Sequence, residues 1–168
     1  MRLDSISLTL LYFNDESAEN IFLDKNQFAG TIPSAVGKLT GLQNIDLGSN
    51  FMTGPLPLEL QALTSLKKFA VVSNDLTGPF FEPFGVAWSQ LEYLNLDGTR
   101  FTGTIPSMVL QQWASSLIDF HLGTTMLNGT LPKEVNSLTK LSNLNVASRN
   151  FGGPFPDISN LGSLGKCQ

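Results

Sequence analysis

The sequence predicts an α/β solenoid. We expect a right-handed coil of about six repeats, with a parallel β-sheet on its concave side and short helical turns and irregular segments on its convex side. Apolar-x-apolar pairs recur at steps of 24, 24, 25, 26 and 24 residues. Glycine and proline positions between the pairs keep the same step. The pairs are Ile21/Leu23, Ile45/Leu47, Phe69/Val71, Leu94/Leu96, Phe120/Leu122 and Leu144/Val146.

Each pair indicates a short strand with one buried face, because residues two apart point to the same side of a strand. A single repeat cannot bury its own apolar face. Stacked repeats cover one another and share a continuous core.

The segment after each strand predicts a turn onto the convex side. Glycine there permits a left-handed backbone, and proline follows in five of six repeats, fixing φ and removing an N–H donor. A stretch such as 34–39 then forms a short helical turn. The glycines are Gly30, Gly54, Gly78, Gly103, Gly129 and Gly153, and the apolar residues two positions later are Ile32, Leu56, Phe80, Ile105, Leu131 and Phe155.

The repeat unit reads L-x-x-L-x-x-L-x-L-x-x-N-x-L-x-G-x-I-P, and it resembles the plant-specific class of leucine-rich repeats over about residues 20–164. That class occurs in receptor-kinase ectodomains, receptor-like proteins and polygalacturonase inhibitors. The resemblance implies an extracellular or cell-surface location. It also implies a ladder of asparagines that bond backbone groups in the turns, at Asn26, Asn50 and Asn74. The matching later positions hold Thr99, Thr125 and Arg149.

The expected organisation has three parts. Residues 1–19 form an irregular N-terminal cap or truncated repeat, 20–164 form the repeat domain, and 165–168 begin a truncated seventh repeat. The first residues do not read as a signal peptide. The paired-cysteine caps of the class are missing, so we interpret the chain as a fragment or an incomplete gene model. A complete domain with irregular caps is the alternative.

The third repeat departs from the unit, and the fourth and fifth repeats are longer. Residues 79–85, Pro-Phe-Phe-Glu-Pro-Phe-Gly, replace the usual turn, and Trp88 and Trp113 lie on convex connections. A convex hydrophobic bump and core filling are both open interpretations, and we favour core filling. We likewise expect both tryptophans to pack in the core.

Composition excludes several classes of function. The net charge is −4, the pI is near 4.8 and no basic cluster exists to neutralise phosphates, which argues against nucleic-acid binding. One cysteine and one histidine cannot form a Cys/His zinc site, and we predict neither metal nor cofactor. No apolar run reaches membrane-spanning length. Oligomeric state stays open.

The outward rows of the concave strands are the candidate binding surface. The surface is mildly acidic and rich in amides, which suits a peptide, a basic protein patch or a glycan. A solvated sheet without a ligand is the alternative. The candidate residues are Phe22, Asp24, Asp46, Lys68, Val72, Tyr93, Asn95, Asp97, Asp119 and His121.

The predicted function is non-catalytic binding of a protein or ligand, as in part of a receptor ectodomain. His121 and Asp119 share a face, but the repeat places no nucleophile beside them. The alternatives are a stand-alone inhibitor of a secreted hydrolase, an intracellular interaction scaffold, and an ice- or surface-binding solenoid. Asn128-Gly129-Thr130 is a glycosylation sequon away from the concave strands, and it matters if the chain is secreted.

Overall fold

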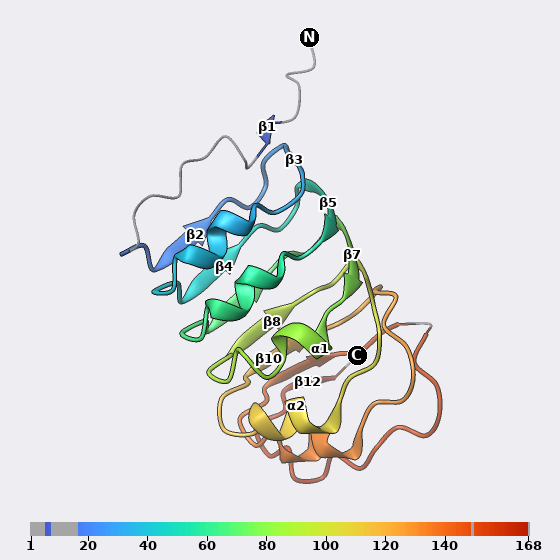
Figure 1. Cartoon of the computed structure of the whole chain (residues 1–168). Helices are drawn as coiled ribbons and strands as arrows, with labels where there is room; N and C mark the ends of the chain where they lie inside the picture. Colours follow the sequence, from blue (N-terminus) through green and yellow to red (C-terminus); the bar gives the residue numbers. More distant parts are fainter. Residues whose placement is uncertain (1–5, 8–16, 149, 168) are drawn as a thin grey trace.

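The computed structural model describes residues 6–7, 17–148 and 150–167, and shows a coil of stacked turns whose repeats follow one another in sequence order (Figure 1). One strand of each turn joins a parallel seven-stranded sheet in the order β12-β11-β10-β8-β6-β4-β2. Its strands are β2 (Asn20–Phe22), β4 (Asn44–Asp46), β6 (Lys68–Ala70), β8 (Tyr93–Asn95), β10 (Asp119–His121), β11 (Asn143–Asn145) and β12 (Lys166–Cys167).

The register of this sheet confirms the repeat alignment. Ile21 lies beside Ile45, which lies beside Phe69, and the same column continues through Leu94, Phe120 and Leu144. The steps of 24 to 26 residues therefore place equivalent side chains side by side. Within this column Phe69, Leu94 and Phe120 are fully buried, at 0% exposure.

A second parallel sheet runs along the other side of the coil (Figure 1). The sequence did not predict it, because its strands contain glycine and proline, which are depleted in strands. Its order is β1-β3-β5-β7-β9, with β1 (Ile6–Ser7), β3 (Phe28–Gly30), β5 (Phe51–Pro55), β7 (Asp75–Pro79) and β9 (Arg100–Thr102).

The glycines of the repeat have the left-handed backbone that the sequence predicts, for example Gly54 at φ 77° and Gly103 at φ 101°. At Gly54 a second constraint applies, because an added Cβ would lie 2.9 Å from Cγ2 of Thr31 in the preceding turn. Real Cβ atoms avoid such a distance, so this glycine also makes room for stacking. Gly103 has nothing within 4 Å of the same position.

Short helical segments lie on the convex side of the coil, as expected, in every turn between β3 and β11. The stretch predicted at 34–39 forms a 3₁₀ helix over Ser34–Lys38, directly after the extended Pro33. The longer fourth and fifth repeats have α-helical turns instead. The segments are η2 (Ser34–Lys38), η3 (Leu58–Ala62), α1 (Phe81–Phe84), α2 (Ser107–Gln112) and η4 (Lys133–Ser137).

The aromatic residues of the third to fifth repeats fill the core, which confirms the favoured interpretation, and a convex bump does not form. Phe80, Phe81 and Phe84 are at most 1% exposed. Trp88 stacks on Phe84 with ring centroids 5.1 Å apart and donates its indole N–H to the carbonyl of Leu60 at 3.0 Å. Trp113 is also fully buried and donates to the carbonyl of Trp88 at 2.9 Å, so both indoles are satisfied.

One expected core position is wrong. Phe155 matches the buried Leu131 in the repeat, yet 54% of it is exposed. Within the described residues no later turn stacks over its side of the coil, and stacking by a following turn is what buries this position elsewhere.

Candidate functional site

Strand alternation places the candidate residues on the concave sheet. Residues on either side of the buried central column point outward, and neighbouring strands are parallel and in register. The most exposed is Phe22, with 58% of its surface accessible. Asp24, Asp46, Lys68, Val72, Tyr93, Asn95, Asp97, Asp119 and His121 are all partly buried.

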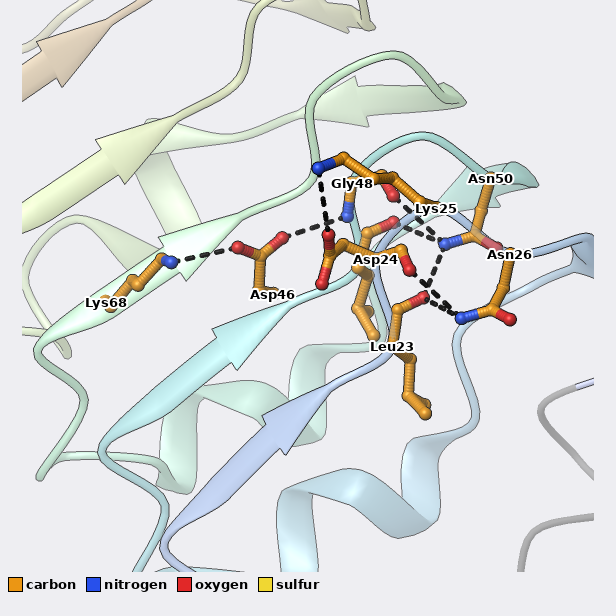
Figure 2. A network of polar contacts seen from close by, with 9 residues as sticks. Leu23, Asp24, Lys25, Asn26, Asp46, Gly48, Asn50 and Lys68 are labelled. Atoms are coloured by element: carbon orange, nitrogen blue, oxygen red, sulfur yellow. Dashed lines mark hydrogen bonds and ion pairs between the residues drawn. The ribbon is translucent and has the colours of Figure 1, made fainter.

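Lys68 is the centre of the first cluster, which spans β2 to β8. Its ammonium is 2.9 Å from a carboxylate oxygen of Asp46, and both side chains are largely covered. The same nitrogen lies 5.8 Å from the ring centroid of Phe22 and 5.3 Å from that of Tyr93. Such distances allow cation–π attraction to both rings. Asp46 also accepts the N–H of Gly48 at 3.2 Å, which fixes the carboxylate (Figure 2).

The second cluster continues from Tyr93 across β10 and β11. The imidazole of His121 lies 5.9 Å from the phenol ring of Tyr93, and its Nε2 is 3.8 Å from a carboxylate oxygen of Asp119. Asn143 donates to the same oxygen of Asp119. Asn95 donates to the hydroxyl of Tyr93 at 3.3 Å. In the described residues no serine, threonine or cysteine bonds to His121, so a catalytic triad is not assembled here.

Asp97 lies beyond Asn95 on the same side of the sheet. Its carboxylate accepts the N–H of Gly123 at 2.5 Å and the side-chain amide of Asn145 at 3.0 Å. Burial removes water from this carboxylate and raises the pKa of Asp97. The Gly123 and Asn145 donors and the nearby His121 oppose that shift without cancelling it.

Asp24 and Val72 contribute less to this surface than their positions in the repeat suggest. Asp24 forms a long ion pair with Lys25, at 3.9 Å, and the Lys25 side chain is 83% exposed. Surface pairs of this kind contribute little to stability. Val72 leans over Gly48, where an added Cβ would come within 2.7 Å of a valine methyl carbon. Its half-buried state follows from this contact.

The asparagines at the expected ladder positions bond backbone carbonyls in the turns (Figure 2). Asn50 is 6% exposed, donates to the carbonyls of Leu23 and Leu47 at 2.9 Å each, and accepts the N–H of Phe28 at 3.0 Å. Asn74 repeats this pattern one turn later, with the N–H of Met52 at 2.9 Å. Asn26 is exposed and makes only two donor bonds.

The ladder changes in the later turns, as its sequence predicts. Thr99 and Thr125 are buried, and each hydroxyl donates to one carbonyl, at 2.6 Å to Leu96 and at 2.8 Å to Leu122. Arg149, the next ladder position, lies outside the described residues. Asn150 instead donates its side-chain amide to the carbonyl of Thr125 at 3.1 Å, a contact that the repeat alignment missed.

The residue before each of the first five ladder positions has a left-handed backbone, which the sequence analysis also missed. Its φ lies near 55° at Lys25, Ser49, Ser73 and Thr124, and Gly98 occupies the same place at 67°. The backbone N–H of each donates to a carbonyl of the next turn, as Ser49 does to Val72 at 2.7 Å. A run of non-glycine residues at this angle is uncommon. The Ser-Asn repetition at 49–50 and 73–74 was the available signal.

The outer face of the second sheet is irregular. Thr53 lies beside Asp75, and Thr77 lies between Pro55 and Arg100. Prolines and charges therefore interrupt the threonines, as the sequence predicts. Asn128 is exposed on this side of the coil, where its backbone N–H bonds the carbonyl of Gly103 at 2.9 Å.

Two further properties concern the described residues only. None of their helices is long and apolar enough to cross a membrane. No group of three histidine, cysteine, aspartate or glutamate side chains among them is arranged to hold a metal ion.

Residues 90–111 match the model of the Leucine Rich Repeat family. The ectodomain of the Arabidopsis receptor kinase HAESA, solved with the peptide hormone IDA and the co-receptor SERK1, superposes with a TM-score of 0.79 at 29% identity, over 89% of this chain and 25% of that one. The chain therefore has the leucine-rich-repeat fold and is similar to plant receptor-kinase ectodomains. No curated protein matches this leucine-rich-repeat chain.

Two other solved structures show the range of the fold. The ectodomain of the Arabidopsis receptor kinase GASSHO1/SCHENGEN3, in complex with CASPARIAN STRIP INTEGRITY FACTOR 2, matches at TM-score 0.70 and 29% identity, over 80% of this chain and 16% of that one. A plant ice-binding protein matches at TM-score 0.68 and 26% identity, over 85% and 44%. This leucine-rich-repeat chain therefore spans a quarter or less of the two receptor ectodomains.

Proposed function

We propose that the chain is a non-catalytic recognition module that binds an extended protein or peptide segment on its concave sheet. The observation that carries the proposal is the exposed Phe22, whose ring lies 5.8 Å from the Lys68 ammonium that also faces Tyr93, on a side of the sheet that folding does not require to be apolar. Aromatic side chains commonly anchor interfaces because they bury a large area at a small cost in side-chain entropy.

The similar structures support the same reading. The HAESA ectodomain is described with a peptide hormone, and it resembles this chain in sequence, at 29% identity, as well as in fold. An inhibitor of a secreted hydrolase or an intracellular scaffold would use the same face. We favour the receptor-type reading because the similar ectodomain is described with a peptide ligand. A glycan would also meet aromatic and amide groups there, and we favour a peptide for the same reason.

The test begins with selection from a displayed library of random 12-residue peptides. Affinities of an enriched peptide are then measured by calorimetry for the wild type, Phe22→Ala and Tyr93→Ala. The control is Phe51→Ala, because Phe51 is 62% exposed but lies on β5 of the second sheet. We expect at least a tenfold loss for the two concave variants and less than a twofold change for the control. Failure to enrich any peptide, or a loss confined to Phe51→Ala, contradicts the proposal.

We also propose that Asn128 carries an N-linked glycan when the chain enters the secretory pathway. Its exposed position on the second-sheet side would keep a glycan away from the concave rows. Secretion from an insect-cell host followed by endoglycosidase treatment should lower the mass, and Asn128→Gln should remove that shift. An unshifted wild-type mass is the contrary result.

A further inference from the structure

Lys68 shows how this sheet holds a positive charge. Its ammonium has a carboxylate at 2.9 Å on β4 and an aromatic ring at 5.3 Å on β8. The Lys68 side chain on β6 points toward Asp46 on the neighbouring strand β4 (Figure 2). A cation on this surface is therefore stabilised by a carboxylate beside it and by a ring face above it.

The same kinds of group recur on the other side of Tyr93. His121 supplies a second ring, 5.9 Å from that of Tyr93, and Asp119 has a carboxylate oxygen 3.8 Å from the imidazole. Asp97 adds another carboxylate on the adjoining row. The kinds of group that surround the Lys68 ammonium, carboxylates and aromatic rings, are thus present again around Tyr93 and His121.

The two places differ in how the carboxylates are compensated. Asp97 is met by the amides of Gly123 and Asn145, and Asp119 by the amide of Asn143. Within the described residues, the ion pairs of lysine and arginine go to Asp24, Asp46 and Asp75 instead. His121 can add one positive charge when it is protonated. With neutral His121 this part of the face therefore carries two partly buried negative charges that neutral donors orient but do not balance.

We infer that the surface formed by Tyr93, Asp97, Asp119 and His121 binds a cationic side chain of the peptide ligand. The inference rests on the proposed function and names the chemistry of its ligand. A guanidinium suits the surface best, because it is planar, donates in several directions and stacks on aromatic rings. An anionic group would meet two carboxylates at short range and be repelled.

The strand order gives the approximate spacing within such a ligand. Phe22 is on β2 and His121 on β10, four strand intervals apart in the sheet. At about 4.8 Å per interval the separation is about 19 Å, or about six residues of extended chain. A peptide that crosses the strands can place an apolar residue on Phe22 and an arginine at the acidic surface.

The experiment uses the peptides enriched in the selection described above, with the whole chain as the binding protein. An arginine of the peptide is replaced by citrulline, which keeps the shape and removes the charge. Affinities of both peptides are measured for the wild type and for Asp97→Asn/Asp119→Asn. Asp75→Asn is the matched control, because Asp75 pairs with Arg100 on the second sheet. Thermal unfolding confirms that each variant is folded. The single variant Asp119→Asn is measured as well, in case the double variant does not fold.

We expect enriched peptides to contain arginine or lysine, and citrulline to weaken binding at least tenfold in the wild type and in Asp75→Asn. In the double variant the two peptides should bind alike, because the coupling between the charges is gone. Enriched peptides without a basic residue overturn the inference, as does a tenfold arginine preference that survives in the double variant. If binding still depends on Phe22 in those cases, the proposed function stands and only the ligand chemistry is wrong. Failure to enrich any peptide overturns both.

Discussion

Replacing Asn50 with alanine tests how the polar ladder holds the turns together. The change removes three donated bonds, to the carbonyls of Leu23, Leu47 and Gly48, and the acceptor for the N–H of Phe28. All three carbonyls keep another donor: the Asn26 amide bonds Leu23, the Asn74 amide bonds Leu47, and the N–H of Lys25 bonds Gly48. The N–H of Phe28 loses its ladder acceptor in a buried position.

The expected cost follows from these contacts. A buried group left without its partner costs about 1–3 kcal/mol, and a donated bond contributes about 0.5–1.5 kcal/mol, less where the carbonyl keeps another donor. We expect Asn50→Ala to lower the free energy of unfolding by about 2–4 kcal/mol. Asn50→Thr should cost about 1–2 kcal/mol, because a threonine hydroxyl keeps one donated bond, as Thr99 does. Asn26→Ala, at an exposed position with two bonds, should cost less than about 1 kcal/mol.

Urea unfolding followed by circular dichroism and by tryptophan fluorescence measures these differences. Trp88 and Trp113 both lie in the later turns, so fluorescence reports there while circular dichroism reports the whole coil. If the two signals separate in Asn50→Ala, the early turns have become independent of the rest. A cost for Asn50→Ala within about 0.5 kcal/mol of that for Asn26→Ala would refute the assigned role of the ladder.

Three further predictions concern the glycines, the tryptophans and Asp97. Gly54→Ala should cost about 1 kcal/mol more than Gly103→Ala, because both have a left-handed φ but only Gly54 faces Thr31 at 2.9 Å. Thr31→Ser should remove that difference in urea unfolding, and equal costs in the parent background contradict the stacking argument. Trp113→Phe should cost about 2–4 kcal/mol, since it leaves a cavity and removes the indole donor from the Trp88 carbonyl, which keeps only the N–H of Leu91; a loss under about 1 kcal/mol contradicts this. Burial raises the pKa of Asp97, so the folded protein binds more protons than the unfolded chain between the two pKa values. The stability that Asp97 gives below its unfolded pKa is therefore lost as pH rises through the folded one, and Asp97→Asn should gain stability relative to the wild type from about pH 4 upward. Urea unfolding between pH 3.5 and 7 checks the trend, and a difference that does not change with pH would contradict it.

Most of the coil was predictable because its determinants are local and periodic. The apolar pairs fix which strand residues face the core, and their equal steps fix the register, so Ile45 had to lie between Ile21 and Phe69. The glycine turns, the helical turn after Pro33 and the burial of Trp88 followed from the same pattern.

The second sheet was not predictable in the same way. A segment such as Phe51–Pro55 contains glycine and proline and forms a strand only because neighbouring turns pair with it. The same dependence on neighbours explains Phe155, whose exposure is set by what stacks on it.

The candidate site was predicted as a set of rows, but its clusters were not. Alternation identified which side chains point outward. It did not indicate that Lys68 would lie between two rings, because that arrangement depends on rotamers chosen in the assembled sheet. Nor did it show that Val72 would pack over Gly48 of the preceding turn, a contact that is possible because glycine has no side chain.

Site-specific photo-crosslinking tests the central claim, concave recognition, most directly. Benzoylphenylalanine is placed at Tyr93 on the concave sheet or at Thr53, which is exposed on β5 of the second sheet. Each protein is irradiated with an enriched peptide, and the adduct is measured by mass spectrometry. The concave account predicts an adduct from position 93 and none from position 53. An adduct from position 53 without one from position 93 would place the ligand on the second sheet and contradict the account.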